Sequence, residues 1–424
     1  MKIISYEEFQ VNGQTSDIEK YKEIDEIVLN IIKNVRLKGD RALFQYARKF
    51  DRVTLESLLV EDEEFEEAEQ LVSAEFKKSV EVAANNIREF HQHQVEKSWF
   101  FHKENGITLG QKVTPMDRVG VYIPGGKAAY PSTVLMNVIP AKLAGVPEIF
   151  IATPPQENGK INAHVLYTAK FLGVERIYKM GGAQAVAAFA YGTETIPKVS
   201  KIVGPGNDFV ARAKKWVFGD VAIDMIAGPS EICVVADESA PAKYVAADLL
   251  SQAEHDEAAT SICITTSEEL AEKISKEVEQ QLSELPREKI ARTSIENNGK
   301  IVVTENLEQA IKLVNEIAPE HLQLMFENAS EYLSEIKHAG AIFLGSYSPE
   351  PLGDYLAGPN HTLPTSGTAK FASPLGVYDF VKKSSIIQYS EEALKKEAPY
   401  IETLANMEGL EAHAKSISIR REER

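Results

Sequence analysis

Segments typical of buried strands alternate with helical segments over most of this chain. The first run starts near Arg118 with RVGVYIPGG and the helical PSTVLMNVIPAKLAG, and it ends with the helical DFVARAKKWVFG. A second run starts after Ser230 with EICVVAD and continues through SICITT, KIVVTEN, EHLQLMF and GAIFLGS, with a helical segment between neighbours. Parallel strands need a crossover connection, which is usually a helix. The order therefore predicts an α/β fold with two parallel sheets, each covered by helices.

The segments outside these runs show mainly helical periodicity. We assign residues 1–20 to an N-terminal helical segment, and residues 21–117, with their acidic helical stretch, to one domain together with residues 230–378. Residues 118–229 then form a second domain. Residues 379–424 form a helical tail with a thin apolar face, which would be marginally stable alone. The tail therefore packs either on its own chain or on a partner subunit.

The charge and composition favour a small-molecule partner. The net charge of −17 repels nucleic-acid phosphates and anionic lipids, and no stripe of lysine and arginine reverses it locally. The start, MKIISYEEFQ, lacks the apolar region of a signal peptide, and no apolar run reaches about 18 residues, so we expect a cytoplasmic protein. Cys233 and Cys263 lie in expected buried strands, which predicts neither a disulfide framework nor an exposed thiol nucleophile.

Glycine-containing turns follow three of the strands expected in residues 118–229. Ligands of open parallel sheets bind at such turns, because glycine allows close approach and the next helix directs N–H groups to the same edge. No GxGxxG motif is present, so ordinary strand-to-helix connections are the simpler interpretation and a dinucleotide site is the alternative. The turns contain Gly125 and Gly126, Gly181 and Gly182 before Gln184, and Gly204 and Gly206 before Asn207.

Three phrases carry side chains that can bind a metal ion. ADLLSQAEHDE is typical of an amphipathic helix, in which the i, i+3 spacing places Gln252 and His255 on one face. LGDYLAGPNHTLPT is typical of a shaped loop, and MEGLEAHAKS of a helical tail. The last two phrases supply Asp354, His361, Glu408 and His413. Each residue taken singly fits a hydrogen-bonded polar side chain, but a mixed nitrogen and oxygen set suits zinc. The predicted zinc ligands are Gln252, His255, Asp354 and His413.

Glu320 and His321 stand together in IAPEHLQL, where Pro319 interrupts a helix and a strand follows. A histidine at such a junction is often structural. A carboxylate beside an imidazole at a sheet edge is also what base catalysis needs.

Several of these phrases resemble the histidinol dehydrogenase family, from about Val113 to about Arg420. The phrases are SQAEHD, GPGNDFVARAKKW, IDMIAGPSE, APEHLQL, AGPNHTLPTSGTAKF and EGLEAHAKS. Glu257 departs from the family pattern, in which we expect a proline after QAEHD. The resemblance implies two incomplete, doubly wound Rossmann-like domains in a homodimer, with the tail swapped onto the partner and with shared active sites.

The resemblance also implies the cofactors and residue roles. It implies one zinc ion per subunit on the four ligands named above, and NAD bound through Tyr122, Gln184 and Asn207. His321 would be the general base, and Glu320 would activate a water molecule. The substrate-binding residues would be Ser230, Gln252, His255, His321, Asp354, His361, Glu408 and His413.

The activity implied by the resemblance is the four-electron oxidation of L-histidinol to L-histidine through bound L-histidinal, the final steps of histidine biosynthesis. Hydration of the aldehyde makes the second oxidation similar to the first, so one base can serve both steps. A zinc hydrolase, in which Glu320 activates a metal-bound water, is an alternative that would form no NADH. A non-catalytic dimeric scaffold is a third interpretation, in which these side chains only pack or face solvent.

Overall fold

The computed structural model describes residues 1–11, 21–125 and 129–422. The chain divides into two compact units, the first built from Met1–Gln94 and Met116–Phe380 and the second from Val95–Pro115 and Val381–Arg424. In the described ranges, no helix is long and apolar enough to cross a membrane.

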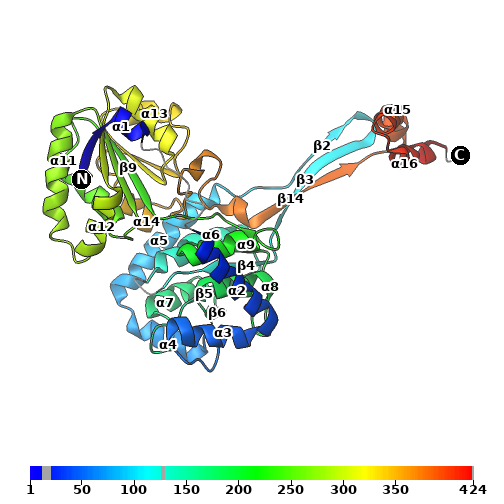
Figure 1. Cartoon of the computed structure of the whole chain (residues 1–424). Helices are drawn as coiled ribbons and strands as arrows, with labels where there is room; N and C mark the ends of the chain where they lie inside the picture. Colours follow the sequence, from blue (N-terminus) through cyan, green and yellow to red (C-terminus); the bar gives the residue numbers. More distant parts are fainter. Residues whose placement is uncertain (12–20, 126–128, 423–424) are drawn as a thin grey trace. The chain divides into compact units, whose positions relative to one another are not determined.

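The first unit contains a six-stranded sheet whose pairs are all parallel, in the order β1-β11-β10-β9-β12-β13 (Figure 1). Alternate side chains of its central strands enter two separate cores, so both faces are buried. This explains the nearly continuous apolar runs in the sequence. The strands are β1 (Lys2–Ser5), β9 (Glu231–Ala236), β10 (Thr260–Thr265), β11 (Lys300–Val303), β12 (His321–Met325) and β13 (Ala341–Leu344). The covering helices are α10 (Ala242–Ala253), α11 (Glu268–Leu282) and α12 (Glu288–Asn298) on one face, and α1 (Tyr6–Val11) and α13 (Leu307–Ile317) on the other.

A second parallel sheet in the same unit has five strands, in the order β6-β5-β4-β7-β8. Its strands are β4 (Arg118–Tyr122), β5 (Glu148–Thr153), β6 (Ile177–Lys179), β7 (Lys201–Val203) and β8 (Ala222–Ile223). One face packs against α4 (Asp62–Leu71), α5 (Ala74–Gln92), α6 (Pro131–Leu143) and α7 (Ala163–Phe171). The other packs against α2 (Lys22–Lys38), α3 (Asp40–Tyr46), α8 (Gly182–Tyr191) and α9 (Asp208–Val217). The prediction of an α/β fold with parallel sheets is confirmed.

Two predicted boundaries differ from the structure. Lys2–Ser5 is a strand that pairs with β11, so residues 1–20 do not begin as a helix. Helices α2 to α5 pack mainly on the five-stranded sheet formed by residues 118–229, and α5 also contacts residues 230–378, where Asn86 donates a hydrogen bond of 2.8 Å to the carbonyl of Leu356. The reason is apolar matching, because the buried stripe of α2 lies against the small, buried residues of α8.

The second unit contains a three-stranded antiparallel sheet, in the order β14-β3-β2. It comprises β2 (Trp99–Lys103), β3 (Ile107–Pro115) and β14 (Val381–Gln388), followed by α15 (Glu391–Met407) and α16 (Glu411–Glu422). The predicted helical tail is therefore wrong at its start, where β14 pairs with β3 over its whole length. The exposed, largely polar sequence of β14 carries little strand periodicity, and its partner strand is distant in sequence.

Short helical segments complete the chain. They are η2 (Ala47–Asp51), η3 (Glu104–Gly106), η4 (Ala329–Ser334), α14 (Glu350–Tyr355), η5 (Thr368–Lys370) and η6 (Val377–Phe380).

Candidate active site

His321 lies at the amino end of β12, next to the amino end of β9. Its Nδ1 is 2.9 Å from the carbonyl oxygen of Glu231. A carbonyl can only accept a hydrogen bond, so Nδ1 carries the proton and Nε2 is left with a lone pair. That Nε2 is buried, and it has no hydrogen-bond partner among the residues that the structure describes. The register between β9 and β12 therefore fixes both the orientation and the tautomer of His321.

Two carboxylates of α14 lie next to Nε2 of His321. Glu350 and Asp354 are four residues apart on one helix face, and their nearest oxygens are 3.6 Å and 4.0 Å from that nitrogen. Burial, followed by the charge of Asp354, raises the pKa of Glu350 to about 9. Glu350 is not among the predicted site residues, because it precedes the predicted loop LGDYLAGPNHTLPT and only the helix α14 places it one turn from Asp354.

Gln252 and His255 border the same cluster from α10, which packs against α14. Helix α10 ends at Ala253, so His255 lies in the following turn and not on the helix as predicted. Gln252 is only 1% exposed, and its Oε1 has no hydrogen-bond partner in the described part of the chain. Burial lowers the pKa of His321, and the imidazole of His255 lowers it further, against the charge of Asp354, which raises it.

The atoms that face this cluster fit a bound cation. His321, Glu350 and Asp354 each offer one ligand atom, and these atoms lie within 4.8 Å of one another. Buried polar atoms in folded proteins rarely lack a partner, yet Gln252 Oε1, His321 Nε2 and Glu350 Oε1 all do so among the described residues. Carboxylate, amide and imidazole donors suit zinc. This group shares Asp354 with the predicted zinc ligands, and its other members are Glu350 and His321, of which His321 was predicted as the base and not as a ligand. The unpaired Oε1 of Gln252, another predicted ligand, belongs to the neighbouring α10.

Glu320 lies on the opposite side of the His321 ring. Its Oε2 accepts a hydrogen bond of 2.8 Å from the backbone N–H of Glu231 and is 3.6 Å from Nδ1 of His321. Burial raises the pKa of Glu320 well above its ordinary value, and the nearby carboxylates of Glu231 and Asp354 raise it further. The predicted pair therefore combines a buried imidazole whose pKa is lowered with a buried carboxyl group whose pKa is raised.

Two further predicted substrate residues lie in the first unit. His361 Nδ1 is 3.1 Å from the carbonyl oxygen of Asp354, and its Nε2 is 3.4 Å from the hydroxyl of Thr133 at the start of α6. Ser230 directly precedes β9 and is half-buried. Glu408 and His413, in contrast, belong to the second unit and are exposed at the end of α15 and in α16.

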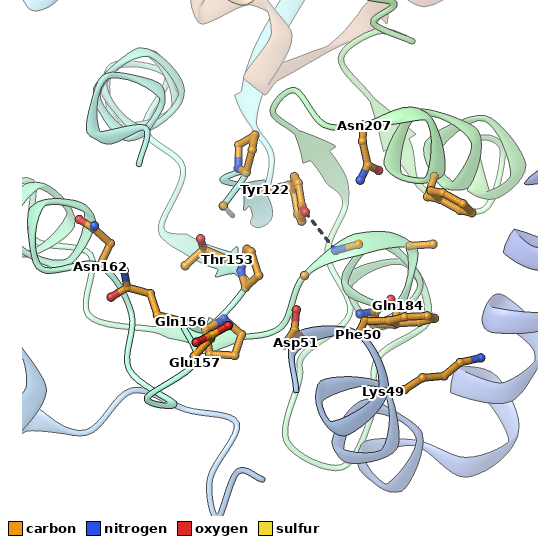
Figure 2. A pocket seen from close by; sticks show the side chains of 18 of the residues that line it. Lys49, Phe50, Asp51, Tyr122, Thr153, Gln156, Glu157, Asn162, Gln184 and Asn207 are labelled. Carbon is orange, nitrogen blue, oxygen red and sulfur yellow. Dashed lines mark hydrogen bonds between the residues drawn. The ribbon is translucent and has the colours of Figure 1, made fainter. Parts of the chain in front are cut away.

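A cavity of about 1200 Å³ lies at the carboxyl ends of the strands in the five-stranded sheet (Figure 2). Tyr122 ends β4, and its hydroxyl accepts a hydrogen bond of 3.0 Å from the N–H of Gly182 at the start of α8. Asn207 caps α9 through a hydrogen bond from Val210, and Gln184 also lines the cavity. The three predicted NAD contacts thus share one cavity. Gly126 of the first predicted turn lies outside the described residues.

The N-terminal helices form one wall of this cavity, which was not predicted. Ile27 and Ile31 of α2 line the cavity, together with Lys49, Phe50 and Asp51 of η2. Only the packing of these helices on the five-stranded sheet brings them there.

Comparison with known proteins identifies the family. The family model described as histidinol dehydrogenase matches residues 14–421. The chain belongs to the histidinol dehydrogenase family. The histidinol dehydrogenase of Oceanobacillus iheyensis is 56% identical over 423 residues, which cover 100% of this chain and 99% of that protein. The histidinol dehydrogenase of Bacillus subtilis is 56% identical over 393 residues, which cover 93% of this chain and 92% of that protein.

A solved histidinol dehydrogenase has the same fold. The crystal structure of the enzyme from Elizabethkingia anophelis is 40% identical and has a TM-score of 0.92, covering 99% of this chain and 98% of that one. Both cysteines of this chain, Cys233 and Cys263, are fully buried, so neither thiol is accessible to a substrate. Burial raises the pKa of both thiols, that of Cys263 to about 12, which agrees with their confirmed burial in the core.

Proposed function

We propose that this member of the histidinol dehydrogenase family oxidises L-histidinol to L-histidine through bound L-histidinal, with two molecules of NAD as acceptors. The observation that carries the proposal is the unpaired Nε2 of His321, which faces a buried, metal-compatible cluster in a chain of this family. A base beside a Lewis-acid site is what the removal of a proton from an alcohol requires.

We propose that Gln252, His255, Asp354 and His413 hold one zinc ion, with His413 supplied by the partner subunit of a homodimer. A bound zinc ion would act as a Lewis acid and would hold the imidazole and amine of the substrate. Burial raises the pKa of Glu350 to about 9, so this group on the same side of His321 is protonated at neutral pH, and a bound divalent cation would favour its charged form. Ser230, His361 and Glu408 would complete the substrate contacts.

His321 has the protonation state that a general base needs. Burial lowers its pKa, so the ring is neutral at pH 7, and Nε2 can accept a proton in each oxidation step. The Glu231 carbonyl holds the opposite nitrogen and would stabilise the protonated ring. Burial raises the pKa of Glu320, so its ionised form is a stronger base than an exposed carboxylate, and that form would take the proton of the water that adds to the aldehyde.

We propose that NAD binds in the cavity at the carboxyl ends of the five-stranded sheet, in an incomplete Rossmann-like domain. Tyr122, Gln184 and Asn207 would contact it there, where the starts of α8 and α9 favour anionic phosphates. The cytoplasm remains the predicted location of this reaction.

The test is NADH formation from L-histidinol and NAD by the purified protein before chelation, after chelation and after zinc is restored. The proposal predicts NADH before chelation, loss of activity on chelation, and recovery with zinc. A zinc hydrolase would form no NADH under any of the three conditions, and that result would overturn the proposal.

A further inference from the structure

Asp51 lines the cavity in which we propose that NAD binds, and it is the last residue of an unusual helix end. Helix α3 continues into η2, a π-helical turn, and the chain then turns sharply at Arg52, whose φ of +61° is left-handed. Single π-helical turns are frequent at functional sites. Figure 2 shows the carboxylate of Asp51 pointing into the cavity below Tyr122, with Gln184 on one side and Glu157 on the other.

The position of Asp51 is unfavourable for a carboxylate in three ways. Its Oδ2 is buried without a hydrogen-bond partner in the part of the chain that the structure describes. Burial alone raises its pKa to about 6. It also ends a helix, where the macrodipole places partial negative charge. A group that destabilises the protein in this way fits a role in ligand binding.

A carboxylate in this place selects among the parts of a dinucleotide. The phosphates are favoured at the starts of α8 and α9, and Asp51 would repel them. A buried carboxylate needs hydrogen-bond donors, and the ribose hydroxyls are uncharged donors. A phosphate on the adenosine ribose would remove one donor and bring two negative charges against Asp51.

We propose that Asp51 accepts hydrogen bonds from the adenosine ribose hydroxyls of NAD and thereby excludes NADP. This inference rests on the proposed function in one respect, namely that the dinucleotide binds in this cavity. On this proposal, Asp51 is the residue that makes the protein prefer NAD, which lacks the 2′-phosphate, over NADP.

The matched variants are Asp51→Asn and Glu157→Gln, because each removes one carboxylate from the cavity wall and Glu157 is exposed. The first readout is the ratio of kcat/KM with NAD to that with NADP, measured with L-histidinol. The second is calorimetric binding of 5′-AMP and of adenosine 2′,5′-bisphosphate, which requires no turnover. Asp51→Asn should shift both preferences toward the 2′-phosphorylated nucleotide by at least about tenfold, and Glu157→Gln by less than about threefold.

Asp51→Glu keeps the charge and should keep the preference for NAD. The inference is overturned if Asp51→Asn leaves both preferences unchanged, or if Glu157→Gln shifts them equally, which would indicate a general charge effect. If the unmodified protein forms no NADH, the proposed function fails, and the two adenosine nucleotides still decide the role of Asp51. A preference for 5′-AMP that is lost in Asp51→Asn would then support that role, and an unchanged preference would overturn it.

Discussion

At the scale of single residues, the chemistry of this site depends on a backbone atom as much as on side chains. The carbonyl of Glu231 holds Nδ1 of His321 at 2.9 Å, so the lone pair of Nε2 points toward Glu350 and Asp354. A neutral ring with a fixed tautomer can take a proton without first losing one.

Replacing His321 by glutamine should lower kcat by about 10²–10⁴-fold, the usual contribution of a general base. Burial lowers the pKa of His321 below its ordinary value of 6.5, so the acid limb of kcat/KM should lie below pH 6.5 in the unmodified protein. The limb should be absent in His321→Gln, whose zinc content should be unchanged. An acid limb that persists in this variant would assign the base to another group.

The pair Glu320 and His321 could be predicted from sequence because the two residues are adjacent and stand at a helix-to-strand junction. Glu231 and Glu350 could not, because their contacts with this pair depend on the register of β9 with β12 and on the placement of α14. Asp51 was missed for the same reason, since only the packing of the N-terminal helices brings it to the cavity.

At the scale of elements, a buried carboxylate links α10 to β12. Asp248 Oδ2 accepts a hydrogen bond of 2.7 Å from Gln323, yet burial raises the pKa of Asp248 from 3.8 to about 6. A raised folded-state pKa means that the contribution of this group to stability is fully present below pH 3.8 and is lost as the pH rises through 6. The charged form therefore lowers the free energy of unfolding by up to about 3 kcal/mol at neutral and alkaline pH.

Asp248→Asn keeps an oxygen acceptor for Gln323 and removes the charge. In chelated protein at pH 8, it should raise the free energy of unfolding by up to about 3 kcal/mol, and by less at pH 5. Urea unfolding at the two pH values measures both gains. Equal gains at both pH values, or a loss at pH 8, would contradict the buried-charge explanation.

The turn after β7 offers a second test at this scale. Gly204 has a φ of +112°, and a Cβ there would lie 2.1 Å from the carbonyl oxygen of Tyr122. Its N–H donates to Asp224 at 2.8 Å, and its carbonyl accepts from Lys214 at 2.9 Å, so the turn cannot move away freely. Gly219 has a similar φ of +109° with nothing near the Cβ position in the described structure, which makes it a matched control.

Gly204→Ala should lower the free energy of unfolding by at least about 2 kcal/mol more than Gly219→Ala does, because the shared backbone strain cancels and the clash remains. Urea unfolding of the two variants gives the difference. Since Gly204 adjoins Tyr122 in the proposed NAD cavity, Gly204→Ala should also raise the KM for NAD. Equal stability losses would show that the turn tolerates the side chain.

At the scale of the whole molecule, the proposed ligands are divided between the two units. Gln252, His255 and Asp354 belong to the first unit, while Glu408 and His413 are exposed in the second. The second unit also exposes large apolar side chains, among them Trp99, Phe100, Ile387 and Met407. These features support a homodimer in which each tail completes the partner's site.

Mixed dimers test the shared site. The His413→Ala variant lacks a proposed zinc ligand and the His321→Ala variant lacks the proposed base, so each alone should be inactive. The two variants are unfolded together in equal amounts and refolded as a mixture. Half of the dimers should be heterodimers with one complete site, so activity should recover to about one quarter of the unmodified level. Refolding each variant alone is the control. If the mixture shows no recovery, the tail serves its own chain.

The central claim is that one pocket carries out both oxidations without releasing the aldehyde. The most direct measurement is the amount of NADH formed per L-histidine produced, in the presence of a reagent that captures free aldehyde. The account predicts two NADH per histidine and no captured histidinal, because the reactive intermediate stays bound. One NADH per histidinol consumed, with captured histidinal as the product, would contradict it.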